Sequence, residues 1–103
     1  MSRYATEDDA LKLIKMCGFT KQVPKPYAHL ARVMGMEEDE FAEFFEEELA
    51  PIYKAALGWR FREGVDYVQL ISPAPKGGPQ LLEEQQRVKE FFRERRRKAL
   101  KYA

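Results

Sequence analysis

The residues that could carry out chemistry are few and lie far apart along the chain. The single histidine, His29, has no evident nucleophile or paired acid with which it could act as a general base. The single cysteine, Cys17, lies on an apolar stripe, where a small core residue is expected rather than a reactive thiol. One histidine and one cysteine cannot form a typical zinc site. The sequence therefore predicts a non-enzymatic protein without metal or cofactor.

Two further segments contain the residue types of ion or phosphate sites but not their spacing. The acidic cluster at residues 37–48 lacks the Asx-Gly spacing of a calcium loop, and is expected to be the solvated face of a helix. Lys76-Gly77-Gly78 lacks the GxxxxGKS or GxxxxGKT pattern of a phosphate loop, and prolines flank it. This second segment is therefore expected to be a linker.

Basic residues form two groups that could contact nucleic-acid phosphates. Arg60 and Arg62 are expected on one face of a strand, with Trp59 and Phe61 on the other. The second group lies at the end of the last predicted helix and consists of Arg93, Arg95, Arg96, Arg97, Lys98 and Lys101. For this group, nucleic-acid contact and a simpler role in helix-dipole stabilisation and solubility are both open.

Charge is unevenly distributed, although the net charge is only +1. Residues 1–58 contain 7 Lys and Arg against 11 Asp and Glu, whereas residues 59–103 contain 11 against 6. Glu40, Glu43 and Glu47 are expected on the outer face of the acidic helix, where they would repel phosphates. Either DNA is bound through the strand and the basic tail, or the acidic face binds a basic protein partner.

Hydrophobic periodicity predicts the elements that position these residues. Helices are expected at about 7–17, 26–34, 37–48, 52–57 and 80–101, and a β-hairpin at about 59–62 and 66–71. Thr6 and Asp9 form a variant of the capping box at the start of the first helix. Pro51 is expected to break or kink the chain, because it lacks an amide proton and crowds the preceding turn. Glu63-Gly64 is expected in the hairpin turn.

The predicted core joins the third helix to the hairpin. It consists of Phe41, Phe44, Phe45, Leu49, Trp59 and Phe61. The last helix has an apolar stripe of its own at Leu81, Val88 and Phe92, which requires a cover. That cover could be the helix at 7–17 of the same chain or the last helix of a second chain. We expect a homodimer, because small winged-helix proteins commonly bind two half-sites.

The order helix, helix, helix, hairpin, long helix resembles a winged helix-turn-helix domain, and Leu30 to Met36 looks like the "LA..LG.." segment of such proteins. The segment Leu30–Val68 is also similar to the N-terminal domain of phage antirepressors, through Arg32-Val33-Met34-Gly35-Met36, Phe41 and Phe61 to Val68. The insert at 50–57 is longer than that family suggests. These resemblances imply a DNA-binding protein of a mobile element.

Composition and length complete the sequence-based expectations. We expect a winged-helix-like core at 1–72, a Pro/Gly linker at 73–79 and a basic C-terminal helix at 80–103, in one compact domain. No apolar run is long enough for a membrane span, and the absence of asparagine with abundant Glu and Arg favours a thermophilic source. The expected function is a small cytoplasmic DNA-associated regulator; the alternative is a protein-interaction or assembly module.

Overall fold

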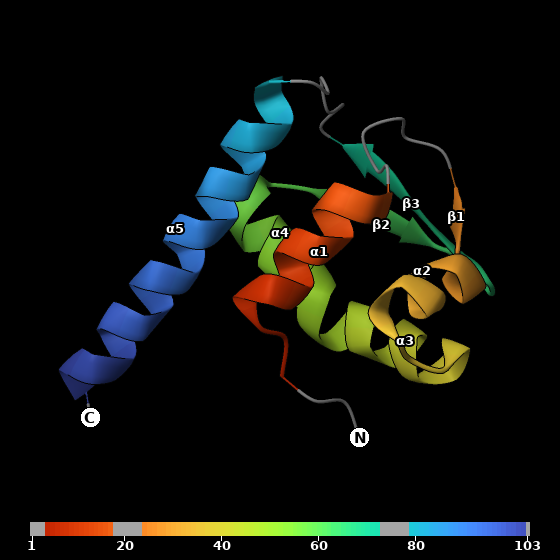
Figure 1. Cartoon of the computed structure of the whole chain (residues 1–103), viewed down its shortest axis with the longest axis horizontal. Coiled ribbons are helices and arrows are strands. Elements are labelled where there is room, and N and C mark those ends of the chain that lie inside the picture. Colours follow the sequence, from red (N-terminus) through yellow and green to blue (C-terminus); the bar gives the residue numbers. More distant parts are fainter. Residues whose placement is uncertain (1–3, 18–23, 73–78, 103) are drawn as a thin grey trace.

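The computed structural model describes residues 4–17, 24–72 and 79–102 of the chain, without the side chains of residues 16, 17, 72, 79–81 and 100–102. Within these ranges the chain is mostly helical, and three short antiparallel strands form one sheet (Figure 1). A mainly α fold with a β-hairpin and a long C-terminal helix is therefore confirmed. The predicted linker at 73–79 falls almost entirely outside the described residues.

Helix α1 (Glu7–Cys17) has the bounds that the sequence predicts. The backbone N–H of Thr6 donates to Asp9 Oδ2 at 3.0 Å, and the N–H of Asp9 donates to Thr6 Oγ1 at 3.2 Å. These reciprocal bonds confirm the capping box, in which each side chain accepts a bond from an N–H that the helix leaves unpaired. Ala10, Leu13 and Ile14 then face the core.

Strand β1 (Lys25–Pro26) was not expected from the sequence, which indicates only a connector there. Prolines favour extended backbone at this point, and the strand pairs with β3, with Lys25 opposite Val68. The N–H of Tyr27 donates to the Asp66 carbonyl at 2.9 Å. Helix α2 (Tyr27–Met34) follows and ends at Gly35, whose φ of 68° suits glycine.

The acidic helix continues through Pro51, so of the predicted break or kink, the break is wrong. Helix α3 (Glu38–Phe44), the π-helical segment η2 (Phe45–Leu49) and helix α4 (Ala50–Leu57) follow one another directly. The N–H of Ala50 bonds to the Phe45 carbonyl, five residues back. This wider turn accommodates the proline, which then stands in the first turn of α4, where a missing N–H costs little. Gly58, with φ 71°, ends α4.

The hairpin consists of β2 (Arg60–Glu63) and β3 (Tyr67–Ser72), and the sheet order is β1-β3-β2. Its turn lies slightly later than predicted, because Glu63 still pairs with Val68 and the Gly64 N–H donates to the Tyr67 carbonyl at 2.8 Å. A Cβ on Gly64 would overlap the Tyr67 ring, so a larger residue there would require the ring to move. The register shifts between Arg60 and Phe61.

The predicted junction between helix and hairpin is confirmed as the centre of the core. Phe41, Phe44, Phe45 and Leu49 are fully buried, and Trp59 is nearly so. The ring of Phe45 meets that of Phe61 edge-on, with 5.0 Å between centroids. Across the core, the Tyr53 hydroxyl donates to the Ala10 carbonyl at 2.7 Å, which ties α4 to α1.

Helix α5 (Pro79–Tyr102) lies along α1 and α4, and its C-terminal end points away from the sheet (Figure 1). Val88 and Phe92 are buried by the chain itself. The sequence left two ways to cover the apolar stripe, another helix of the same chain or a second chain. In the structure the same chain covers Val88 and Phe92, so the expectation that these two residues face a second chain is wrong. The side chain of Leu81 lies outside the described part.

Candidate nucleic-acid interface

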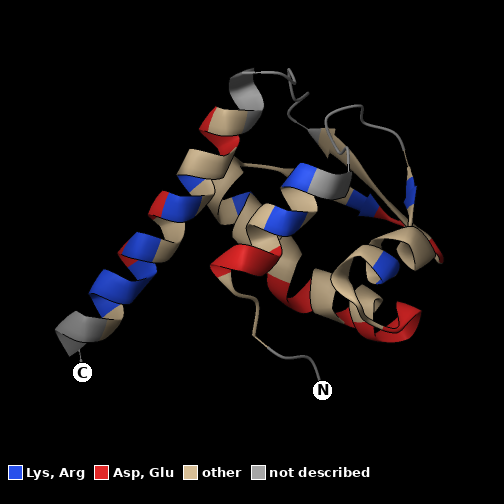
Figure 2. Ribbon diagram, viewed as in Figure 1, with Lys and Arg blue, Asp and Glu red and all other residues tan. Residues whose placement is uncertain are grey.

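The C-terminal half of α5 presents its basic side chains to solvent. Phe92 is the last buried side chain among the described residues of α5, and beyond it Arg95 and Ala99 are exposed. The remaining basic residues are exposed as well, namely Arg93, Arg96, Arg97 and Lys98. Lys101 belongs to the helix, but its side chain is not described. This part of α5 is thus a positively charged rod (Figure 2).

Two of these arginines have neighbours on the same helix. The Arg95 guanidinium lies over the rings of Phe91 and Phe92, with 5.1 and 5.7 Å to their centroids. Arg97 Nη1 lies 3.3 Å from Glu94 Oε2 in an exposed ion pair. Such exposed pairs contribute about 0–1 kcal/mol, so Arg97 can exchange its partner for a phosphate at little cost.

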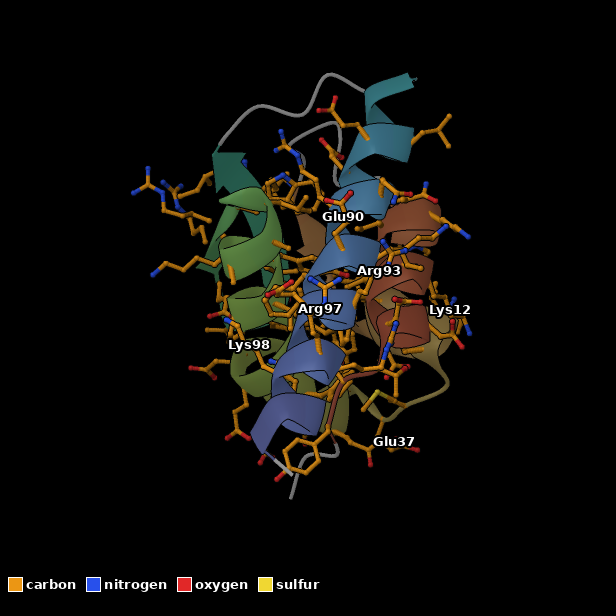
Figure 3. The ribbon with its side chains drawn as sticks, turned by 90° about the vertical axis from the view of Figure 1, so that its left-hand side faces the viewer. Lys12, Glu37, Glu90, Arg93, Arg97 and Lys98 are labelled. Carbon is orange, nitrogen blue, oxygen red and sulfur yellow. The ribbon has the colours of Figure 1, made fainter. Side chains whose placement is uncertain are left out.

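Helix α1 adds a cation that the sequence did not single out. In the view onto α5, Arg93 and Arg97 lie in the centre, Lys12 of α1 at one side and Lys98 at the other (Figure 3). Lys12 and Lys15 are exposed because they lie on the outer side of α1, away from its buried stripe. The outward spacing of Lys12 and Lys15 was a usable signal, but only the packing of α1 against α5 makes it relevant.

The two basic groups that the sequence suggested are not brought together into one strip. Arg60 and Arg62 are exposed on β2, as predicted. Figure 2 shows the basic segments of β2 and of the C-terminal half of α5 at separate places on the molecule. Arg60 instead borders a depression of about 450 Å³ between β2 and the helix η2–α4, together with Glu46 and Glu63.

The acidic face of the long helix is exposed, as predicted. Glu40, Glu43 and Glu47 are all accessible, and acidic segments cover α3, η2 and the first turn of α1 (Figure 2). Glu48 is partly buried, and its Oε1 accepts a hydrogen bond from the Ala5 N–H at 3.1 Å, which fixes the segment before α1. Part of this negative charge lies beside the basic half of α5, because Arg95 lines one depression together with Glu47 and Glu48.

Burial perturbs three acidic groups. Burial, followed by the nearby carboxylates of Glu63 and Glu46, raises the pKa of Tyr27 to about 12. Partial burial and the Glu46 carboxylate raise the pKa of Glu63. Burial also raises the pKa of Glu84, against the opposing effect of Arg87, and Glu84 Oε2 has no hydrogen-bond partner. Glu46 and Glu63, which contribute to these first two shifts, line the same depression beside β2.

The histidine, the cysteine and the metal and membrane expectations of the sequence can now be compared with the structure. His29 is exposed on α2, and the side chain of Cys17 lies outside the described part. Among the described residues, no three His, Cys, Asp or Glu side chains gather closely enough to hold a metal ion. Within the same ranges, no helix combines the length and the apolar character needed to cross a membrane.

Comparison of the chain with protein-family models, with curated proteins and with solved structures finds no match.

Proposed function

We propose that this chain is a small, non-enzymatic DNA-associated regulatory protein of the winged-helix kind, which binds phosphates through the C-terminal half of α5. The observation that carries the proposal is the exposed basic rod beyond Phe92, where Arg93, Arg96 and Lys98 extend from a helix that Val88 and Phe92 anchor in the core near its middle. Cations fixed on a packed helix lose less freedom on binding phosphate than cations on an unstructured tail.

The arrangement of elements supports the winged-helix part of this proposal. Three helical regions precede a hairpin, and β1, between α1 and α2, pairs with β3 to form a small sheet under the wing. The wing strand β2 presents Arg60 and Arg62, which serve as a second, smaller phosphate contact. We propose a cytoplasmic location with this function.

The acidic helix is not the DNA reader in this proposal. Glu40, Glu43 and Glu47 would bring like charges against the phosphates if α3 and η2 entered a groove. A homodimer would need a surface other than the one that the sequence suggested, since Val88 and Phe92 are covered by α1 and α4.

Salt-dependent binding to random-sequence DNA tests the proposal. Each neutralised phosphate contributes about −0.9 to the log–log slope of affinity against salt. Changing Arg93, Arg96 and Lys98 together to Gln should therefore flatten the slope by up to roughly 2.7, and should weaken all sequences alike. The matched control changes Lys25, Arg32 and Arg87 to Gln, which removes three cations outside both the C-terminal half of α5 and strand β2.

The outcomes separate the proposal from its alternatives. Arg60→Gln or Arg62→Gln should flatten the slope by about one or less, and Glu43→Gln with Glu47→Gln should leave binding equal or slightly stronger. If the control triple flattens the slope as much as the α5 triple, the contact is diffuse and the assignment to α5 is wrong. No DNA binding at low salt would reject the function itself.

A second candidate function rests on the acidic face. Glu40, Glu43 and Glu47 are exposed together along one continuous helix, which suits a protein-interaction module with a basic partner. In that case Glu43→Lys with Glu47→Lys abolishes binding to a basic partner such as poly-lysine, while the α5 triple leaves it unchanged. This outcome, combined with an absence of DNA binding, would favour the second candidate.

A further inference from the structure

A groove runs between the outer strand of the sheet and the long helix. One wall is the helix from Glu46 to Lys54, and the other is β2, which has β3 as its neighbour in the sheet order. The helical wall is about 12 Å long at 1.5 Å per residue, and β2 spans about 10 Å at 3.3 Å per residue. The two walls thus match in length, and the depression between them has a volume of about 450 Å³.

The middle of the groove is apolar. Ala50 and Pro51 contribute from α4, and the partly buried Phe61 contributes from β2. Glu46, Ala50 and Lys54 recur at intervals of four residues, so they form one row along the helix. The π-helical segment before Ala50 keeps this row continuous past Pro51, which would otherwise break the wall.

The two ends of the groove carry opposite charge. Glu46 and Glu63 lie at one end, and their proximity is reflected in the raised pKa of Glu63, which partial burial and the Glu46 carboxylate cause. Lys54 and Arg60 lie toward the other end, because α4 runs from Ala50 to Leu57 and β2 starts just after it. Among the described residues, no ion pair joins any of these four side chains to another.

We propose that this groove binds an extended peptide segment of another protein, with a cationic side chain at its N-terminal end, an apolar side chain in the middle and a carboxylate at its C-terminal end. Antiparallel alignment with β2 is the more stable way for a segment to lie beside a strand, and it places the cation near Glu63 and the carboxylate near Arg60. Side chains at positions one, three and five face the same way and span about 13 Å, which matches the walls.

This surface is separate from the basic half of α5, so it adds a protein partner to the proposed DNA contact. The probe is the peptide acetyl-Lys-Thr-Val-Thr-Glu-amide. Trp59, the only tryptophan of the chain, lines the groove, so its fluorescence reports occupancy. Saturable fluorescence and amide NMR shifts at the groove are expected, with a dissociation constant of about 0.1–5 mM for so short a ligand.

Charge exchange provides the decisive comparison. Glu63→Lys should weaken the probe at least about tenfold and make acetyl-Glu-Thr-Val-Thr-Glu-amide the better ligand. Lys54→Glu should instead favour acetyl-Lys-Thr-Val-Thr-Lys-amide. Glu43→Lys on α3 is the matched control, because it makes the same charge change on an exposed side chain outside the groove and should leave the preference for the probe unchanged.

Each other result overturns the proposal. The proposal is wrong if the probe gives no saturable shifts up to about 10 mM. It is also wrong if Glu63→Lys and Lys54→Glu leave the peptide preference unchanged, or if Glu43→Lys changes it equally. Groove shifts produced by a DNA oligonucleotide in place of the peptide would assign the groove to nucleic acid. The variant with Arg93, Arg96 and Lys98 changed to Gln is tested for DNA binding in a separate experiment. Its result does not change the peptide test, so each proposal can be rejected without the other.

Discussion

Replacing Phe45 with alanine should cost more stability than most single changes, because this ring connects the long helix to the hairpin. Its side chain is 0% exposed, and it meets Phe41 at 5.9 Å and Phe61 at 5.0 Å between ring centroids. Phe-to-Ala changes at such sites cost about 3–5 kcal/mol, through lost transfer free energy and the cavity left behind. This is a large part of the ~5–15 kcal/mol that stabilises a typical domain.

Urea unfolding followed by Trp59 fluorescence measures this cost. The midpoint should fall with an unchanged slope, and the melting temperature should drop by more than about 12 °C, given about 4–8 °C per kcal/mol for a domain of this size. Phe45→Leu, which keeps an apolar side chain, should lose much less. The control Glu43→Ala removes an exposed side chain from the same helix and should stay within about 0.5 kcal/mol. A loss below about 1 kcal/mol for Phe45→Ala would refute the burial of this ring.

Two further predictions concern α5 and the pH dependence of stability. Val88→Ala should destabilise the chain by about 2 kcal/mol, because Val88 is 0% exposed. Leu82→Ala should cost little, because Leu82 is 69% exposed. Equal effects of the two changes in thermal melts would contradict the packing of α5. Because the pKa of Glu63 is raised, the folded chain binds a proton at Glu63 more tightly than the unfolded chain does. Glu63 therefore lowers the stability as the pH rises from its ordinary pKa of 4.5 through its higher pKa in the folded chain. Glu63→Gln should therefore be more stable than the parent at pH 7, with a smaller difference at pH 4 in urea titrations; a variant that is less stable at pH 7 would show that the carboxylate is favourable in the fold.

Local signals in the sequence were sufficient for the start of α1 and for the ends of α2 and α4. Thr6 and Asp9 lie three residues apart, and the capping box needs only that spacing and an adjacent helix. Gly35 and Gly58 end their helices because the left-handed conformation is accessible to glycine without strain. Exposure of the basic residues after Phe92 also followed from the sequence, since residues 93–98 contain only charged side chains.

Local signals misled where a partner distant in the sequence decides the outcome. Pro51 is a helix breaker by itself, yet burial of Phe45, Leu49 and Tyr53 on one face favours a continuous helix, and the π-helical segment accommodates the proline. The two residues of β1 carry too little pattern to be recognised, because only their pairing with β3 makes them a strand.

By itself, the sequence determined the helical content, the hairpin, the aromatic core and the separation of acidic from basic residues, because each depends on periodicity or composition within one segment. Only the tertiary structure decided what covers Val88 and Phe92, since that depends on how α1 and α4 pack together. The same holds for the groove beside β2: Glu46, Lys54, Arg60 and Glu63 line one groove only because β2 folds back along the helix that precedes it.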